Sequence, residues 1–276
     1  MNQILVVGAT GLLGSSAVRH LDKAGHQVRL LVRNAEKAVD LFGVRYEIVI
    51  GDVLNEENLA QALEGCQGVH ISLDGNVELP AVKKISAFAK DAGVQRIGYV
   101  SGITVCEENT WFPYVAEKYA AEQVLESCGV PFTIFAPGWF YEMLGNFVKF
   151  GRALSFGRHP IHYHFMAVED FGRMAAGAYG KEEAANQRFI IRGQEAIRFH
   201  DALRQYCAVL HPKIQRILTM PYGFAKLVAR LRRSDEMAWA VAFMQYFEQV
   251  GECEGGEKAD RILGNPQISF TDWLAA

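Results

Sequence analysis

The stretch ILVVGATGLLGSSAV, residues 4–18, decides the fold of this chain. Residues 4–7 form a short apolar run that is typical of a buried strand, and the small and apolar residues that close the stretch are typical of a helix. Gly8, Gly11 and Gly14 lie between them. We expect a tight turn at Gly8, a close backbone approach at Gly11 and close packing of the helix at Gly14. Because the first N–H groups of a helix have no partner within it, this turn predicts a phosphate site.

The alternation of strand and helix continues through the first half of the chain. The apolar runs that predict strands are 4–7, 28–32, 47–50, 69–72, 96–100 and 131–135. They are apolar throughout, as in a sheet that helices cover on both faces, and repeated strand–helix units make such a sheet parallel. The sequence therefore predicts an α/β protein with a doubly wound, parallel Rossmann sheet, and we assign residues 1–155 to this domain.

Beyond residue 137 the alternation of strands and helices is less regular. One further strand is expected there, at 188–193. Helical patterns occur over 168–180, 199–210, 224–233 and 235–250. We assign residues 156–276 to a small, mostly helical substrate-binding region that is interleaved with the core. No readable motif marks the segment that shapes its pocket.

Composition excludes several classes of protein. Lysine and arginine number 28 and acidic residues 31, a balance that gives no reason to expect a nucleic-acid partner. The five cysteines are scattered without a C-x-x-C pair, which argues against a zinc site and fits a reducing compartment. No apolar run approaches the roughly 20 residues that span a bilayer. We expect a soluble, cytoplasmic protein without a membrane partner.

Further motifs follow the glycine turn in order. Arg33 follows the second strand, GDV (51–53) the third and VSG (100–102) the fifth. Together with GATGLLG (8–14), they resemble the short-chain dehydrogenase/reductase superfamily in its extended and atypical branches. The pattern is most similar to the NmrA-like NAD(P)H-binding family, which includes NADPH-dependent quinone reductases and redox-sensing regulators. The resemblance covers nearly the whole chain and is loose over residues 195–250.

The resemblance implies a nicotinamide cofactor on the first domain. Its diphosphate would lie on the turn, at Gly8, Thr10, Gly11, Leu12, Leu13 and Gly14. A carboxylate about 20 residues after the glycines bonds the ribose of NAD, whereas an arginine there suits the 2′-phosphate of NADP. Because Arg33 occupies this place and no acid occurs between the second strand and Glu36, NADP(H) is favoured, and NAD(H) stays open. The alternative is a surface arginine paired with Glu36. The resemblance also places Asp52 and Val53 beside the adenine.

The stretch FPYVAEK contains Tyr114 four residues before Lys118, which puts both on one helix face. In the superfamily, a tyrosine in this pattern exchanges a proton with the substrate, and the lysine binds the cofactor ribose and lowers the tyrosine pKa. Ser101 then polarises the substrate oxygen, with Thr104 as the alternative. NmrA-like proteins commonly keep the lysine and lack the tyrosine, so Tyr114 can also be an ordinary helix residue. We interpret the similar spacing from Tyr222 as structural.

Two other clusters, one aromatic and one of histidines, are candidates for a functional role. Trp139 and its two aromatic neighbours follow the sixth strand. They could line the nicotinamide site or pack the C-terminal region, and the two roles are compatible. His159, His162 and His164 lack nearby cysteines or convincing carboxylates, so we expect no metal site.

The first hypothesis is an NADP(H)-dependent oxidoreductase that reduces a small carbonyl or quinone-like substrate. A non-catalytic, NAD(P)H-sensing regulatory protein and an NAD-dependent epimerase or dehydratase are the alternatives. The substrate's identity stays open, as do a homodimer and a regulatory protein partner.

Overall fold

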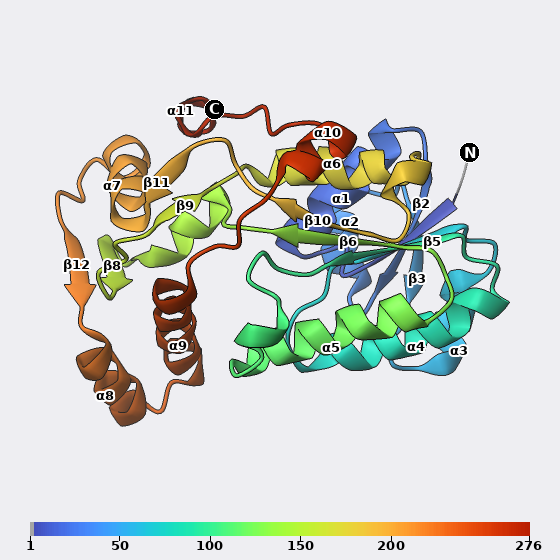
Figure 1. Cartoon of the computed structure of the whole chain (residues 1–276), viewed down its shortest axis with the longest axis horizontal. Helices are drawn as coiled ribbons and strands as arrows, with labels where there is room; N and C mark the ends of the chain where they lie inside the picture. The colour runs from blue at the N-terminus through green and yellow to red at the C-terminus, as the bar shows by residue number, and fades with distance from the viewer. Residues whose placement is uncertain (1–2) are drawn as a thin grey trace. The chain divides into compact units, whose positions relative to one another are not determined.

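A seven-stranded sheet, entirely parallel, forms the centre of the computed structural model, which describes residues 3–276 (Figure 1). Its order is β10-β6-β5-β4-β1-β2-β3. The strands are β1 Gln3–Val7, β2 Gln27–Val32, β3 Glu47–Ile50, β4 Gly68–Ile71, β5 Arg96–Val100, β6 Phe132–Pro137 and β10 Gln187–Ile191. The prediction of a doubly wound Rossmann sheet is confirmed. The strand order reverses between β1 and β4, the kind of point where such sheets bind ligands.

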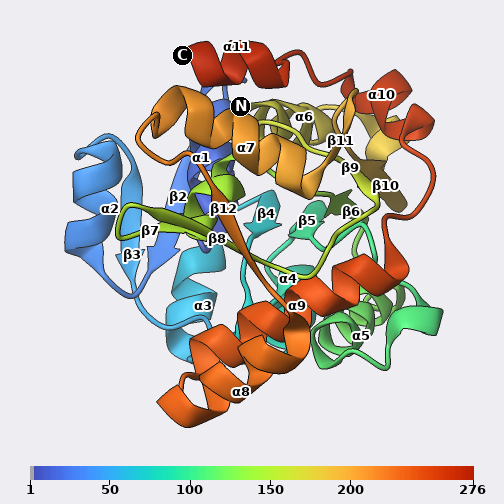
Figure 2. The ribbon, with the colours of Figure 1, turned by 90° about the vertical axis from the view of Figure 1, so that its left-hand side faces the viewer.

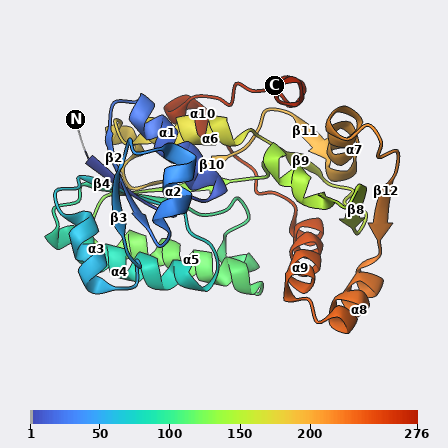
Figure 3. The same cartoon turned by 180° about the vertical axis from the view of Figure 1, so that it is seen from behind.

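Helices cover both faces of the sheet (Figure 1 and Figure 3). One face carries α1 Leu12–Lys23, α2 Ala35–Phe42 and α6 Val168–Ala178, and the other carries α3 Glu56–Leu63, α4 Glu78–Asp91 and α5 Pro113–Ser127. Ile4 and Val6 pack with the first group, whereas Leu5 and Val7 pack with the second. Because neighbouring strand residues point to opposite faces and both faces are buried, the strand shows no polar alternation.

Close contact with α6 holds α1 in place. A Cβ added to Gly172 would lie 2.2 Å from Ser16 Oγ, so only glycine lets the two helices approach this closely. Ser16 Oγ donates to the carbonyl of Val168 at 3.0 Å, and Arg19 forms an ion pair with Glu169 at 2.8 Å. The helix whose first turn follows the glycines is therefore firmly positioned against the sheet.

The chain forms two compact units, and each unit is built from several separate segments of the sequence. The first comprises the chain up to Pro137, Val168–Ile191 and Gly255–Asn265, and includes α10 Glu257–Leu263. The second comprises Gly138–Ala167, Arg192–Glu254 and Pro266–Ala276. The sequence-based division at residue 155 therefore differs from these units, because segments 168–191 and 255–265 return to the first sheet and its helices.

The second unit contains three expected helices, α7 Phe199–Leu210, α8 Tyr222–Arg232 and α9 Asp235–Val250. It also contains α11 Phe270–Ala275, which was not predicted from the sequence. Figure 2 shows α8 and α9 as a packed pair. Two small sheets accompany them, built from β7 Val148–Lys149, β8 Arg152–Phe156, β9 His162–His164, β11 Ala196–Arg198 and β12 Ile217–Met220. No helix in the described part of the chain is long and apolar enough to cross a membrane.

Candidate functional site: a glycine turn and a buried lysine

Two of the three glycines in the turn are required by the fold itself. Gly8 has a φ of +83°, and a Cβ there would lie 1.9 Å from the Ser72 carbonyl oxygen at the end of β4. A Cβ on Gly14 would lie 2.2 Å from the Gly8 carbonyl oxygen. Both positions are closed to any larger residue, because the obstructing atoms belong to the backbone.

Gly11 is different, because a Cβ there would meet only the Gly8 carbonyl oxygen, at 3.3 Å. Its φ of −83° suits any residue, and the position is exposed. The protein's own packing therefore gives little reason for glycine at this place. Close approach of a ligand to the backbone supplies one, as expected for a diphosphate.

The start of α1 has the properties of an anion site. Gly11 is its N-cap and offers no side chain to the first-turn N–H groups, and this turn contains no acidic residue. Leu12 is half exposed, while Thr10 and Leu13 are partly buried beside it. The N–H groups and the positive end of the helix dipole thus favour a negatively charged group here.

The ends of β2 and β3 present the other expected cofactor contacts. Arg33 is exposed and directly follows β2. Asp52 follows β3, and its carboxylate accepts from the Leu54 N–H at 2.9 Å. Val53 has a side chain in the apolar core, so this residue offers a ligand its backbone alone. The three residues lie after the carboxyl ends of adjacent parallel strands, as a nucleotide site in this fold requires.

Lys118 is held inside the first unit by a carboxylate. Its Nζ donates to Glu78 Oε1 at 2.6 Å and to the Val100 carbonyl at 3.3 Å. The two side chains are 3% and 1% exposed. The Tyr99 hydroxyl donates to the same Glu78 oxygen at 2.8 Å. Helices α4 and α5 and strand β5 thus contribute one residue each to a buried polar cluster.

Tyr114 lies against this cluster. The Lys118 ammonium is 5.2 Å from the centre of its ring, so the structure brings together the two residues that the helical spacing paired. Burial raises the pKa of Tyr114 to about 12, although the neighbouring Lys118 lowers it. The phenol is therefore protonated at neutral pH, which suits a proton donor.

Ser101, the third predicted member, forms a different set of contacts. Its Oγ donates to Glu122, whose carboxylate also pairs with Arg188 Nε at 3.0 Å. Arg188 Nη2 donates to the carbonyls of Gly102 and Val105, at 3.1 and 2.9 Å. These bonds fix the loop after β5. Thr104, the alternative hydroxyl, lies in this loop and is 3% exposed.

Replacing Ser101 with alanine distinguishes a structural from a catalytic serine. Loss of a buried hydrogen bond to a carboxylate should lower the free energy of unfolding by about 1.5–3 kcal/mol. Urea unfolding measures this change. We expect kcat to fall far less than the roughly 100-fold that removal of a catalytic donor costs. A large fall in kcat at unchanged stability would instead assign Ser101 to the chemistry.

Glu78 and Tyr99 are members of the cluster that sequence reasoning missed. Glu78 looks like an ordinary acidic residue in the first turn of a helix, where the dipole favours it. Tyr99 looks like one more apolar strand residue. Their one signal is their position in the fold. Glu78 opens the helix after β4, the strand that neighbours β1, and Tyr99 lies near the carboxyl end of β5.

The aromatic residues after β6 pack against other rings of the second unit. Trp139 is 2% exposed and contacts five rings of the second unit at centroid distances of 5.0 to 5.9 Å. These are Tyr163, Phe165, Phe199, Phe243 and Phe247. Its two aromatic neighbours are also buried. They form the core of this unit.

Two of the three histidines in the same region bond to protein groups, and His162 is exposed. His159 lies between the hydroxyls of Tyr163 and Tyr222, at 3.0 and 3.2 Å, and His164 Nδ1 is 2.9 Å from Glu252. Between residues 3 and 276, no cluster of three or more metal-ligating side chains occurs.

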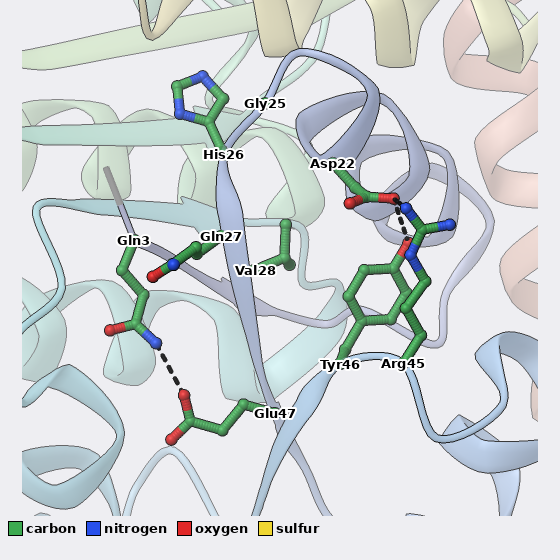
Figure 4. A pocket seen from close by; sticks show the side chains of 9 residues that line it. All are labelled: Gln3, Asp22, Gly25, His26, Gln27, Val28, Arg45, Tyr46 and Glu47. Atoms are coloured by element: carbon green, nitrogen blue, oxygen red, sulfur yellow. Dashed lines mark hydrogen bonds and ion pairs between the residues drawn. The ribbon is translucent and has the colours of Figure 1, made fainter. Parts of the chain in front are cut away.

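A hollow of about 440 Å³ lies at the opposite, amino-terminal edge of the sheet, beside the starts of β1, β2 and β3 (Figure 4). Asp22 bonds Arg45 at 2.6 Å and Tyr46 at 3.1 Å, and Gln3 bonds Glu47 at 2.7 Å. None of the predicted site residues lines it. Its polar groups largely satisfy one another.

Comparison with known proteins agrees with this geometry. The photosystem II assembly factor Ycf39 of Cyanophora paradoxa is 26% identical over 263 residues, covering 90% of this chain and 80% of that protein. An NAD(P)H azoreductase of Xenophilus azovorans is 27% identical over 202 residues, covering 70% and 69%. The crystal structure of Citrobacter sp. triphenylmethane reductase with NADP(H) is 20% identical, covers 99% of this chain and 100% of that one, and has a TM-score of 0.80. The model of the NAD(P)H-binding family matches residues 8–153. The chain therefore belongs to this NAD(P)H-binding family, and its cofactor is NAD(P)H.

Proposed function

We propose that this protein is an NADP(H)-dependent oxidoreductase that reduces a small carbonyl or quinone-like compound. The observation that carries the proposal is the pairing of Tyr114 with Lys118 in the unit that contains the glycine turn. A protonated tyrosine beside a buried cation is a suitable donor to a substrate oxygen. The azoreductase and triphenylmethane reductase relatives support an oxidoreductase.

Arg33 supports NADP(H) over NAD(H), because a guanidinium pairs with a 2′-phosphate and NAD has none. Arg33→Ala should weaken NADPH binding by about 10- to 100-fold, as expected for the loss of charged hydrogen bonds. Binding of NADH should stay within about twofold, since it lacks the partner. Isothermal titration calorimetry with each cofactor measures both affinities.

The matched control is Lys37→Ala, which removes an exposed cation from the first turn of α2. We expect this variant to bind both cofactors like the native protein. Equal losses of NADPH and NADH affinity in Arg33→Ala would contradict a contact with the 2′-phosphate.

Turnover tests the reaction itself. NADPH oxidation should be measured with a panel of quinones, aldehydes and ketones, in the native protein and in Tyr114→Phe. Loss of carbonyl reduction in Tyr114→Phe supports the proposed donor. A native protein that binds NADPH tightly and oxidises it with no member of the panel would contradict the oxidoreductase proposal.

A cofactor-sensing, non-catalytic role is the second candidate. It is favoured by the relative named as a photosystem II assembly factor, which aligns with 90% of this chain. Such a protein would bind NADPH without turnover and retain a protein partner only in the presence or only in the absence of the cofactor. An affinity pull-down with and without NADPH distinguishes this role from catalysis. Tightly bound NAD in the purified protein would instead support an epimerase or dehydratase.

A further inference from the structure

The Glu78 carboxylate lies where it controls the charge next to Tyr114. Its Oε1 is 2.6 Å from Lys118 Nζ, and little water reaches either side chain. We propose that Glu78 is a positioning residue that holds and neutralises Lys118, and thereby keeps Tyr114 a phenol that donates a proton during reduction. This inference rests on the oxidoreductase function proposed above and adds the protonation state in which Tyr114 begins the reaction.

The groups around Lys118 come from several elements. Asp74 precedes α4, Glu78 opens it, Tyr99 lies in β5 and Tyr114 lies in α5. Burial alone lowers the pKa of Lys118, but Tyr114, Glu78 and Asp74 together raise it above its usual value. Lys118 therefore remains a cation at neutral pH, and two carboxylates oppose its charge.

Together with burial, this balance of charges sets the protonation state of Tyr114. A cation that no carboxylate opposes stabilises a phenolate and lowers the pKa of the tyrosine beside it. Here burial raises the pKa of Tyr114 to about 12; Lys118 lowers it, and Asp74 and Glu78 raise it again. Removal of the Glu78 charge takes away a contribution that favours the phenol. Tyr114 should then lose its proton at a lower pH.

The proton balance shows which form of Tyr114 reduction requires. Bound NAD(P)H supplies the hydride. As the carbonyl carbon of the substrate gains that hydride, the carbonyl oxygen takes the π electron pair and forms a bond to the Tyr114 proton. The phenol O–H bond breaks, and the resulting phenolate recovers a proton from water. Oxidation of an alcohol requires Tyr114 to begin as the phenolate base, the form that Glu78 disfavours.

The test follows the ionisation of Tyr114 by ultraviolet difference absorbance of the phenolate. The difference between the native protein and Tyr114→Phe gives the ionisation of Tyr114 in the native protein. The difference between Glu78→Gln and the double variant Glu78→Gln/Tyr114→Phe gives it in the absence of the Glu78 charge. The midpoint for Tyr114 should fall by at least about one pH unit in Glu78→Gln. The alkaline limb of kcat/KM for NADPH-dependent reduction should move with it. Glu57→Gln, which removes an exposed carboxylate from α3, should move neither.

An unchanged Tyr114 midpoint in Glu78→Gln would overturn the inference. Ionisation of Tyr114 below about pH 9 in the native protein would do the same, and this measurement does not depend on the folding of any Glu78 variant. The titration needs no turnover. A shifted midpoint in a protein that oxidises NADPH with no substrate would support the effect of Glu78 on Tyr114 and overturn the proposed function.

Discussion

Lys118→Met should lower the free energy of unfolding by about 3–5 kcal/mol, because Glu78 would keep a buried charge without its cationic partner. The length and apolar stem of the side chain are retained, so loss of charge is the main change. Urea unfolding monitored by circular dichroism measures the effect. Combining Lys118→Met with Glu78→Gln should recover more than half of the lost stability, since no isolated charge then remains.

Lys84 provides the matched control. Its Nζ lies 2.6 Å from Glu56 Oε1, the same distance as in the buried pair, but this pair is at the surface. Surface ion pairs are screened by water, so Lys84→Met should change stability far less than Lys118→Met. Equal effects of the two substitutions, or a double variant no more stable than Lys118→Met, would contradict the account of Lys118 as a buried counter-charge.

Gly11→Ala should weaken NADPH binding by about 100-fold, or about 2.7 kcal/mol, with little loss of folding stability. A Cβ at this position would make one tight contact with the protein, 3.3 Å from the Gly8 carbonyl oxygen, whereas a diphosphate on the first turn of α1 would have to give way to it. The expected cost in the free energy of unfolding is about 1 kcal/mol, since alanine is a poorer N-cap than glycine. Calorimetry with NADPH and urea unfolding measure the two quantities.

Gly14→Ala is the contrasting variant. Its Cβ would lie 2.2 Å from a backbone oxygen, so we expect a loss of about 3 kcal/mol or more in folding stability. Native NADPH affinity in Gly11→Ala would mean that no ligand approaches the backbone there. The diphosphate site would then have to be abandoned.

The sequence predicted the first unit well because its strands are continuously apolar and its turns carry glycine. Residues 28–32 and 96–100, for example, read as strands and lie within β2 and β5. The small sheets of the second unit were not predicted. β7 has two residues and β9 has three, too few for a periodic pattern to appear.

The site was predicted to the extent that it depends on local geometry. The proximity of Tyr114 and Lys118 follows from the pitch of one helix. The contact of Glu78 with Lys118 joins residues 40 positions apart, and that of Ser101 with Glu122 joins residues 21 apart. Such pairs depend on how strands and helices pack, which residue spacing along the chain does not reveal.

The first unit is assembled from three separate stretches of chain, the last of which ends at Asn265. During translation, the sheet is therefore incomplete until β10 has left the ribosome, and its helical layer is incomplete until α10 has followed. Until then, the glycine turn would belong to an incomplete sheet whose apolar strands are exposed. Chaperone demand during synthesis should consequently depend more on this late closure than on chain length.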